Sequence, residues 1–183
     1  KLSPEIAIIT NIDSDHMDHF KTFENLKKAF LDFAYRIPFY GMVVVCGDDP
    51  AVRELFSNFS KRIVFYGFDS KNDYLIEGEK GSYAIYENNI AHNEKIKIGE
   101  LKLPNAPGKH NALNATASLI AAMAAGINFE MCAHGLEKFE GVDRRFQFKG
   151  EACQIKVYDD YGHHPTEVLA TLQAFREKFE HNR

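Results

Sequence analysis

Apolar residues in the first part of the chain form short continuous runs. Such runs are typical of strands that are covered on both faces of a parallel sheet. They occupy residues 6–12, 41–47 and 62–68. We therefore expect three buried, parallel strands in this part of the chain.

The segments between these runs have a helical spacing instead. From Thr22 to Ile37, apolar residues recur every three or four positions, which predicts an amphipathic helix that Pro38 ends. Asp49 and Pro50 supply a cap and a first residue for a second helix. Strands and helices that alternate in this order predict an α/β fold with a largely parallel sheet flanked by helices.

The pattern changes in the middle of the chain. Residues 69–103 contain short alternating runs separated by Gly and Asn, which predict an antiparallel meander attached to the parallel sheet. Helical periodicity returns in residues 110–127, which are rich in Ala and closed by Gly126, and again in residues 129–139. We expect two further helices after the meander.

The end of the chain predicts a second unit. Residues 140–151 are interpreted as a joint, residues 153–161 as a strand, and the segment that begins at Pro165 as a helix. The apolar stripe of this helix consists of Val168, Leu172, Phe175 and Phe179. We therefore divide the chain into a central domain, residues 1–142, and the first strand-helix unit of a Rossmann-like domain, residues 143–183.

Composition narrows the class of protein without naming a function. The 183 residues are 45% hydrophobic and 26% charged, which is typical of a globular chain rather than a disordered one. A net charge of -4 gives no electrostatic reason to expect nucleic acid or an anionic membrane as a partner. Cys46, Cys132 and Cys153 have no CxxC spacing, which indicates free thiols in a reducing, cytosolic compartment.

The loop after the first predicted strand is rich in metal-binding side chains. In the sequence NIDSDHMDHF, His16 and His19 alternate with Asp13, Asp15 and Asp18. Carboxylates suit Mg²⁺ or Mn²⁺ and an imidazole adds a further ligand, so one metal with water and phosphate could sit here. The alternative is a polar loop in which Asp and His cap the next helix.

Two other segments hold side chains suited to a nucleotide. Asn111 and Asn114 share one face of a predicted helix, and their carboxamides offer both donor and acceptor to an adenine edge. Asn at a helix start is also a common cap. Arg144 and Arg145 lie in the predicted joint, where a guanidinium could grip a phosphate between two domains or form an ordinary surface ion pair.

The segment YDDYGHHPTEV, residues 158–168, is predicted to be a strand-to-helix loop, at the edge where open α/β sheets bind ligands. A zinc site would need three or four convergent ligands. His163 and His164 are adjacent, and adjacent side chains diverge, which argues against one shared metal. A cysteine nucleophile is also disfavoured, because Cys153 lies inside a predicted strand.

Taken together, these segments resemble a known family. The order and approximate spacing of motifs in the Mur ligases are matched by ITNIDSDHMDHF, PGKHNALNATAS, GVDRRFQFKGE and VYDDYGHHPTEV. The last motif most resembles the branch that joins L-alanine to UDP-N-acetylmuramate in peptidoglycan precursor synthesis. The closest competitor is the branch that recycles murein tripeptide, which tends to have Phe-Ala where this chain has Tyr161 and Gly162.

The resemblance implies a reaction. In the Mur ligases, ATP phosphorylates the substrate carboxylate to an acyl phosphate, and the amine of the amino acid attacks it. The tetrahedral intermediate then collapses to the amide, ADP and phosphate. Mg²⁺ and cationic side chains stabilise charge on the transferring phosphoryl group. The resemblance thus implies a cytoplasmic ligase with ATP and Mg²⁺ as cofactors, which acts on small molecules rather than on nucleic acid or membrane.

The resemblance also implies roles for individual residues. His16 is expected to be the Mg²⁺ ligand, and Asp160 the carboxylate that reaches the nucleotide when the C-terminal domain closes. Arg145 is expected to contact phosphate at the hinge, and Tyr161 and His163 to face L-alanine. Adenine is expected to lie beside His110, Asn111 and Asn114. His164 is expected to begin a helix.

One motif of the family is missing. The nucleotide loop of type GxxGK[ST] is not found, and the nearest match, Gly108-Lys109-His110, lacks the hydroxyl residue. We therefore expect the chain to be a fragment that begins inside the ATPase domain, ends inside the amino-acid-binding domain, and is inactive by itself. A non-catalytic relative that binds a nucleotide or a protein partner is the alternative of a different class.

Overall fold

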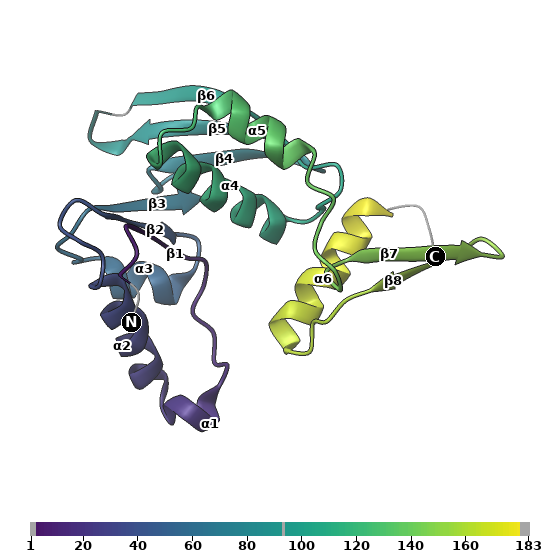
Figure 1. Cartoon of the computed structure of the whole chain (residues 1–183), viewed down its shortest axis with the longest axis horizontal. Helices are drawn as coiled ribbons and strands as arrows, with labels where there is room; N and C mark the ends of the chain where they lie inside the picture. The colour runs from purple at the N-terminus through teal and green to yellow at the C-terminus, as the bar shows by residue number, and fades with distance from the viewer. Residues whose placement is uncertain (1–2, 93, 180–183) are drawn as a thin grey trace.

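The chain folds into a six-stranded sheet with helices on both faces and a separate hairpin that carries one helix (Figure 1). This computed structural model describes residues 3–92 and 94–179. The strands of the sheet follow one another in sequence order: β1 (Ile6–Ile9), β2 (Met42–Cys46), β3 (Ile63–Gly67), β4 (Tyr74–Glu79), β5 (Ser82–Asn89) and β6 (Glu94–Lys102).

The first four strands are parallel and the last three are antiparallel, with β4 shared between the two parts. Ile6 pairs with Met42 and Val43 with Ile63 in the parallel part. Strand β4 pairs with β3 in parallel over a short stretch and with β5 in antiparallel over its whole length. The predicted α/β fold, a largely parallel sheet with an attached meander, is confirmed.

Strand β2 lies at the centre of two hydrophobic cores. Met42, Val44 and Cys46 face the core formed with α4 (Lys109–Ala124) and α5 (Phe129–Glu137). The alternate residues Val43 and Val45 face α2 (Phe23–Ala34) and α3 (Pro50–Phe56). All five residues are buried because helices cover both faces of the sheet, which explains why the strand is a continuous apolar run.

The helices begin where side chains can cap them. The hydroxyl of Thr22 accepts a hydrogen bond from the N–H of Asn25 at the start of α2. The carboxylate of Asp49 accepts one from the N–H of Val52 at the start of α3, and Pro50 occupies the first turn as predicted. The sequence did not predict the short helices α1 (Met17–Phe20) and η1 (Ile90–His92).

The second unit differs from its prediction in one element. Part of the predicted joint forms β7 (Gln147–Ala152), which pairs in antiparallel with β8 (Ile155–Asp159). Cys153 and Gln154 connect the strands with φ angles of 50° and 65°, which is typical of a type I′ hairpin turn. The prediction that Cys153 lies inside a strand was wrong, and its thiol is exposed while Cys46 and Cys132 are buried.

Helix α6 (Pro165–Lys178) packs on this hairpin through aromatic rings. Phe175 contacts Phe146 and Tyr158 at ring-centroid distances of 4.3 Å and 5.1 Å, and Phe179 lies beside them. Val168 and Leu172 are 41% and 54% exposed, so only the C-terminal half of the predicted apolar stripe is covered by the hairpin. None of the described helices is long and apolar enough to span a membrane.

Candidate functional site

The loop between β8 and α6 is held to the joint by Asp160. One oxygen of its carboxylate accepts a hydrogen bond from the N–H of Phe146, and the other accepts one from the N–H of Gly162, each at 2.8 Å. Gly162 fits here because a Cβ would lie 2.8 Å from the Asp160 carboxylate. Asp160 therefore fixes the path of the loop, whatever further role it has.

Tyr161 is held by Arg144. The N–H of Tyr161 donates to the carbonyl of Arg144 at 2.7 Å, and the Arg144 guanidinium lies 4.4 Å from the centre of the Tyr161 ring. The ring of His163 lies edge-on to Tyr161 at 5.2 Å. Both side chains are largely exposed, so they are available to a small molecule.

Glu167 connects the loop to the predicted hinge arginine. Its carboxylate accepts hydrogen bonds from the N–H groups of His163 and His164 at 3.3 Å and 3.4 Å. It also lies 3.4 Å from Nη1 of Arg145. The backbone bond from His163 and the other partners lower the pKa of Glu167 and keep it ionised. His164 occupies the N-cap position of α6, where it was expected to begin the helix.

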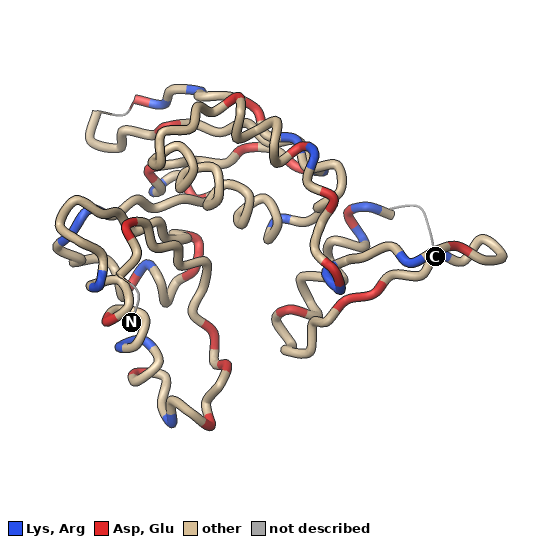
Figure 2. The backbone as a smooth tube through the Cα atoms, in the orientation of Figure 1, with Lys and Arg blue, Asp and Glu red and all other residues tan. Residues whose placement is uncertain are grey.

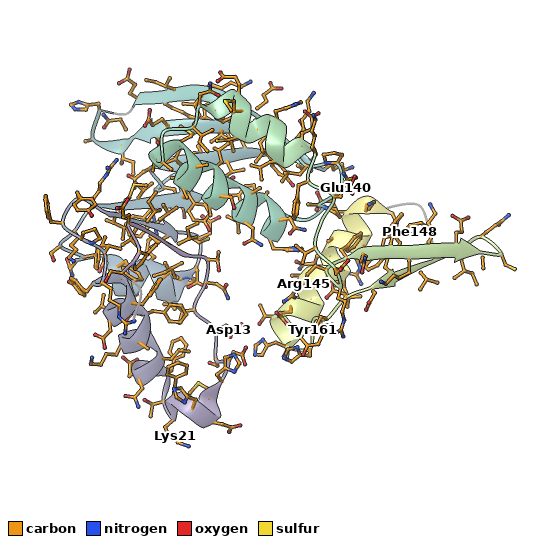
Figure 3. All side chains as sticks on the ribbon, viewed as in Figure 1. Asp13, Lys21, Glu140, Arg145, Phe148 and Tyr161 are labelled. Carbon is orange, nitrogen blue, oxygen red and sulfur yellow. The ribbon has the colours of Figure 1, made fainter. Side chains whose placement is uncertain are left out.

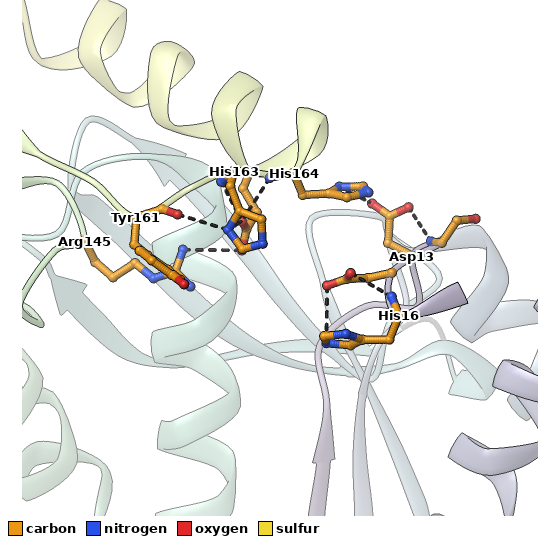
Figure 4. Close-up of polar contacts among 9 residues, drawn as sticks. Asp13, His16, Arg145, Tyr161, His163 and His164 are labelled. Atoms are coloured by element: carbon orange, nitrogen blue, oxygen red, sulfur yellow. Dashed lines mark hydrogen bonds and ion pairs between the residues drawn. The ribbon is translucent and has the colours of Figure 1, made fainter. Parts of the chain in front are cut away.

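The loop after β1 approaches this site through Asp13. Its carboxylate accepts a hydrogen bond from the Thr166 hydroxyl at 2.7 Å. The same carboxylate lies 3.7 Å from Nδ1 of His164 (Figure 4). The Thr166 hydroxyl and the N–H of Ser14 lower the pKa of Asp13. The loop thus meets the start of α6. His16 occupies the N-cap position of the next helix, α1, without a side-chain hydrogen bond, and the later helix α2 is capped by Thr22.

His16 lies on the same loop, close to only one acidic group. Its side chain is 79% exposed, and Nε2 lies 3.6 Å from the Asp15 carboxylate. Among the described residues, no three His, Cys, Asp or Glu side chains converge as a metal ion would require. One imidazole does not by itself make a Mg²⁺ site, which takes six ligands, mainly oxygens. The described residues therefore do not fit the ion on their own.

The nucleotide candidates occupy the first turns of α4. The side chain of Asn111 donates a hydrogen bond to the carbonyl of Pro107 at 2.7 Å, and the N-cap position of α4 is Gly108 rather than an Asn. Asn114 is exposed one turn later. His110 is partly buried, and its burial lowers its pKa. The positive charge of Arg145 lowers this pKa further, whereas the negative charges of Asp160 and Glu177 raise it. The start of α4 thus faces the second unit.

The structure brings the predicted residues His110, Arg145 and Asp160 close together and places Tyr161 beside His163. Figure 3 shows Asp13, Arg145 and Tyr161 on the facing sides of the two units. His110 lies close enough to Asp160 and Arg145 for their charges to shift its pKa.

Acidic and basic residues are distributed along the whole backbone (Figure 2).

Several residues in this arrangement were not assigned a role from the sequence. Thr166, Glu167 and Glu177 all lie on α6, and each contacts a residue outside that helix. The spacing of His164 and Glu167 resembles a capping box and was a usable signal for Glu167. Thr166 and Glu177 had no such signal, because their partners are distant in the sequence.

The carboxyl end of β2 holds another polar cluster, which is structural. It lines a hollow of about 520 Å³. The Asp48 carboxylate accepts hydrogen bonds from the N–H groups of Phe68 and Asp69 and from the Asn72 side chain. Arg53 donates to the Gly47 carbonyl and to Asn72. These groups are satisfied by one another.

Comparison with known proteins identifies the family. A profile of the Mur ligase middle domain matches residues 1–122, and a profile described as "Mur ligase, glutamate ligase domain" matches residues 144–183. The chain belongs to the Mur ligase family. The resemblance read from the four motifs is therefore confirmed.

Several Mur ligases are similar to this chain along its whole length. UDP-N-acetylmuramate–L-alanine ligase of Bdellovibrio bacteriovorus is 64% identical over 183 residues, which cover 100% of this chain and 40% of that relative. The ligase of the same name from Lawsonia intracellularis is 45% identical, with coverage of 100% and 40%. The crystal structure of UDP-N-acetylmuramate–alanine ligase from Thermotoga maritima matches with a TM-score of 0.78 and 29% identity, over 97% of this chain and 39% of that one. The chain thus spans about two fifths of its Mur ligase relatives.

Proposed function

We propose that this chain is part of a ligase that joins L-alanine to UDP-N-acetylmuramate during peptidoglycan precursor synthesis. The observation that carries the proposal is the 64% identity to a ligase of that name, which extends over the whole chain. The Tyr161-Gly162 pair favours this branch over the one that recycles murein tripeptide. The arrangement of the loop after β1, the start of α4 and the loop before α6 supports a shared site.

The proposed reaction is ATP-dependent and takes place in the cytoplasm. ATP phosphorylates the carboxylate of UDP-N-acetylmuramate, and the amine of L-alanine displaces phosphate to form the amide. Mg²⁺ would neutralise phosphate charge in the complete enzyme. His16 remains our predicted ligand for it, with the other ligands supplied by water, phosphate oxygens and residues outside this chain.

The residues of this chain have distinct proposed tasks. Arg145 stabilises the charge of the transferring phosphoryl group; its guanidinium is half-exposed and only loosely paired with Glu167, so it is free to bind an anion. Tyr161 and His163 orient L-alanine, and Asp160 contacts the nucleotide. His110, Asn111 and Asn114 line the adenine side.

Replacement of Arg145 in the full-length enzyme tests this proposal. Arg145→Ala should raise the activation barrier by about 2–4 kcal/mol, because it removes a charge that stabilises the transition state. Binding of UDP-N-acetylmuramate should change little. Turnover is measured by phosphate release, and substrate binding by calorimetry. Arg176→Ala, at an exposed position of α6, is the matched control. Unchanged turnover in Arg145→Ala would remove this residue from the site.

A further inference from the structure

Helix α6 has two contact faces, of which the sequence pattern revealed one. Phe175 and Phe179 pack on the hairpin of their own unit. Thr166, Ala174 and Glu177 lie on the opposite side of the helix, within an arc of roughly 80° at 3.6 residues per turn. Each of these three residues contacts the central unit.

The first contact is between Thr166 and Asp13. The Thr166 hydroxyl donates to the Asp13 carboxylate at 2.7 Å, and His164 lies 3.7 Å from the same oxygen. The two bonded residues are 153 positions apart in the sequence. The contact connects the loop that carries His16 to the loop that carries His163.

The second contact is between Ala174 and Gly108. Ala174 is fully buried although it lies on the outside of its own small unit. A Cβ on Gly108 would lie 2.9 Å from the Cβ of Ala174, so the glycine leaves the room that the helix occupies. Small residues on both sides let the helix approach the start of α4 closely.

The third contact is between Glu177 and the turn that joins β4 to β5. The Glu177 carboxylate accepts a hydrogen bond from the N–H of Lys80 at 2.8 Å. Thr166 and Glu177 are separated by about 16 Å along the helix at 1.5 Å per residue. The helix is therefore held near both ends and in the middle.

We propose that Asp13 and Thr166 are positioning residues that latch the closed arrangement of the two units, with Ala174 and Glu177 completing the docking face of α6. The helix then holds the His163 loop against the loop after β1. The existence of the latch does not depend on the proposed function. The importance of the latch for catalysis does rest on that function.

The latch can be tested without any activity measurement. The exposed thiol of Cys153 takes one spin label, and a cysteine introduced at exposed Met131 of α5 takes the other. Thr166→Val should raise the ratio of open (undocked) to closed (docked) molecules about 10-fold in pulsed-EPR distance distributions, which corresponds to ~1.4 kcal/mol for a lost hydrogen bond to a charged group. Thr166→Ser keeps the hydroxyl and should match the unsubstituted protein.

Hydrogen exchange separates undocking from unfolding. Thr166→Val should speed exchange of the Lys80 N–H, at the far end of α6, while the amides of buried β2 stay protected. Asp13→Ala, which removes the acceptor of this hydrogen bond, should give the same result. The latch is refuted if both variants match Thr166→Ser in distance distribution and in the exchange rate of the Lys80 N–H. It is also refuted if the amides of β2 lose as much protection as the Lys80 N–H, because the variants would then unfold rather than undock.

Kinetics of the full-length ligase test the consequence for catalysis. Thr166→Val should lower kcat by up to about 10-fold with little change in KM for UDP-N-acetylmuramate, because the closed state becomes less populated. Thr166→Ser should restore kcat. An unsubstituted parent that forms no amide would overturn the proposed function, while the distance measurements would still decide on the latch.

Discussion

At the scale of single residues, the groups that the sequence marked as chemical also hold the backbone. Asp160 binds the N–H groups of Phe146 and Gly162, and Asn111 binds the carbonyl of Pro107. The sequence identified these side chains by type, but it could not say how many of their hydrogen-bonding positions are used locally. That number depends on the path of the chain around each residue.

His110 allows a prediction about pH. Burial lowers its pKa in the folded protein, so the unfolded chain binds the proton more readily. The free energy of unfolding should therefore fall as the pH drops below about 6.5, the pKa of histidine in the unfolded chain. The fall should end once the pH is below the pKa of His110 in the folded protein. His110→Gln should lose less unfolding free energy than the unsubstituted protein between about pH 7.5 and 5.5.

Urea unfolding at the two pH values measures this difference. His134→Gln controls for the loss of a histidine from an exposed helical position on α5. Identical pH dependence in the His110 and His134 variants would contradict the prediction.

At the scale of elements, local signals and distant contacts contributed differently. The cap at Asp49 fixed the start of α3 as predicted, because a cap acts within four residues of its own position. Thr22 caps α2, a role that the sequence had not assigned to it. Strand β7 has a bulge between Phe148 and Gly150 and is stabilised by its pairing with β8. The docking face of α6 consists of Thr, Ala and Glu, which resembles an exposed helix surface in sequence.

Two glycines with similar φ angles test the close approach of α6 to α4. Gly108 and Gly126 have φ angles of 97° and 93°, but only Gly108 has a neighbour where a Cβ would go. Gly126→Ala should cost about 1–2 kcal/mol from the backbone alone. Gly108→Ala should cost about 1–3 kcal/mol more, because Ala174 or the His110 ring must move.

The free energy of unfolding in urea reports both effects. Gly126→Ala serves as the control for the backbone term. If the two variants lose the same free energy of unfolding, α6 can move away from residue 108 without a loss of stability, and the close approach does not contribute.

At the scale of the whole molecule, the residues of the proposed site lie where the two units meet. The loop after β1, the start of α4 and the loop before α6 meet there, and the sequence had marked all three. The relatives are more than twice as long as this chain. The remaining parts of the proposed active site are expected to come from the rest of the parent protein.

This incompleteness leads to a prediction for the isolated chain. No GxxGK[ST] loop occurs in its 183 residues, so no backbone cradle for the ATP phosphates is available. We expect the purified chain to release no phosphate from ATP when L-alanine and UDP-N-acetylmuramate are present. The full-length parent, assayed in parallel, should release it. Phosphate release by the isolated chain that depends on L-alanine would contradict this expectation.

The sequence by itself determined the α/β class, the order of the principal helices and strands, and the family. Apolar spacing, helix caps and contiguous motifs are local, so they can be read along the chain. Only the tertiary structure decided that β7 pairs with β8, that α6 has a second face, and that Asp13 meets Thr166. Those contacts join residues that are distant in the sequence or have no distinctive pattern, and they form only when the whole chain is packed.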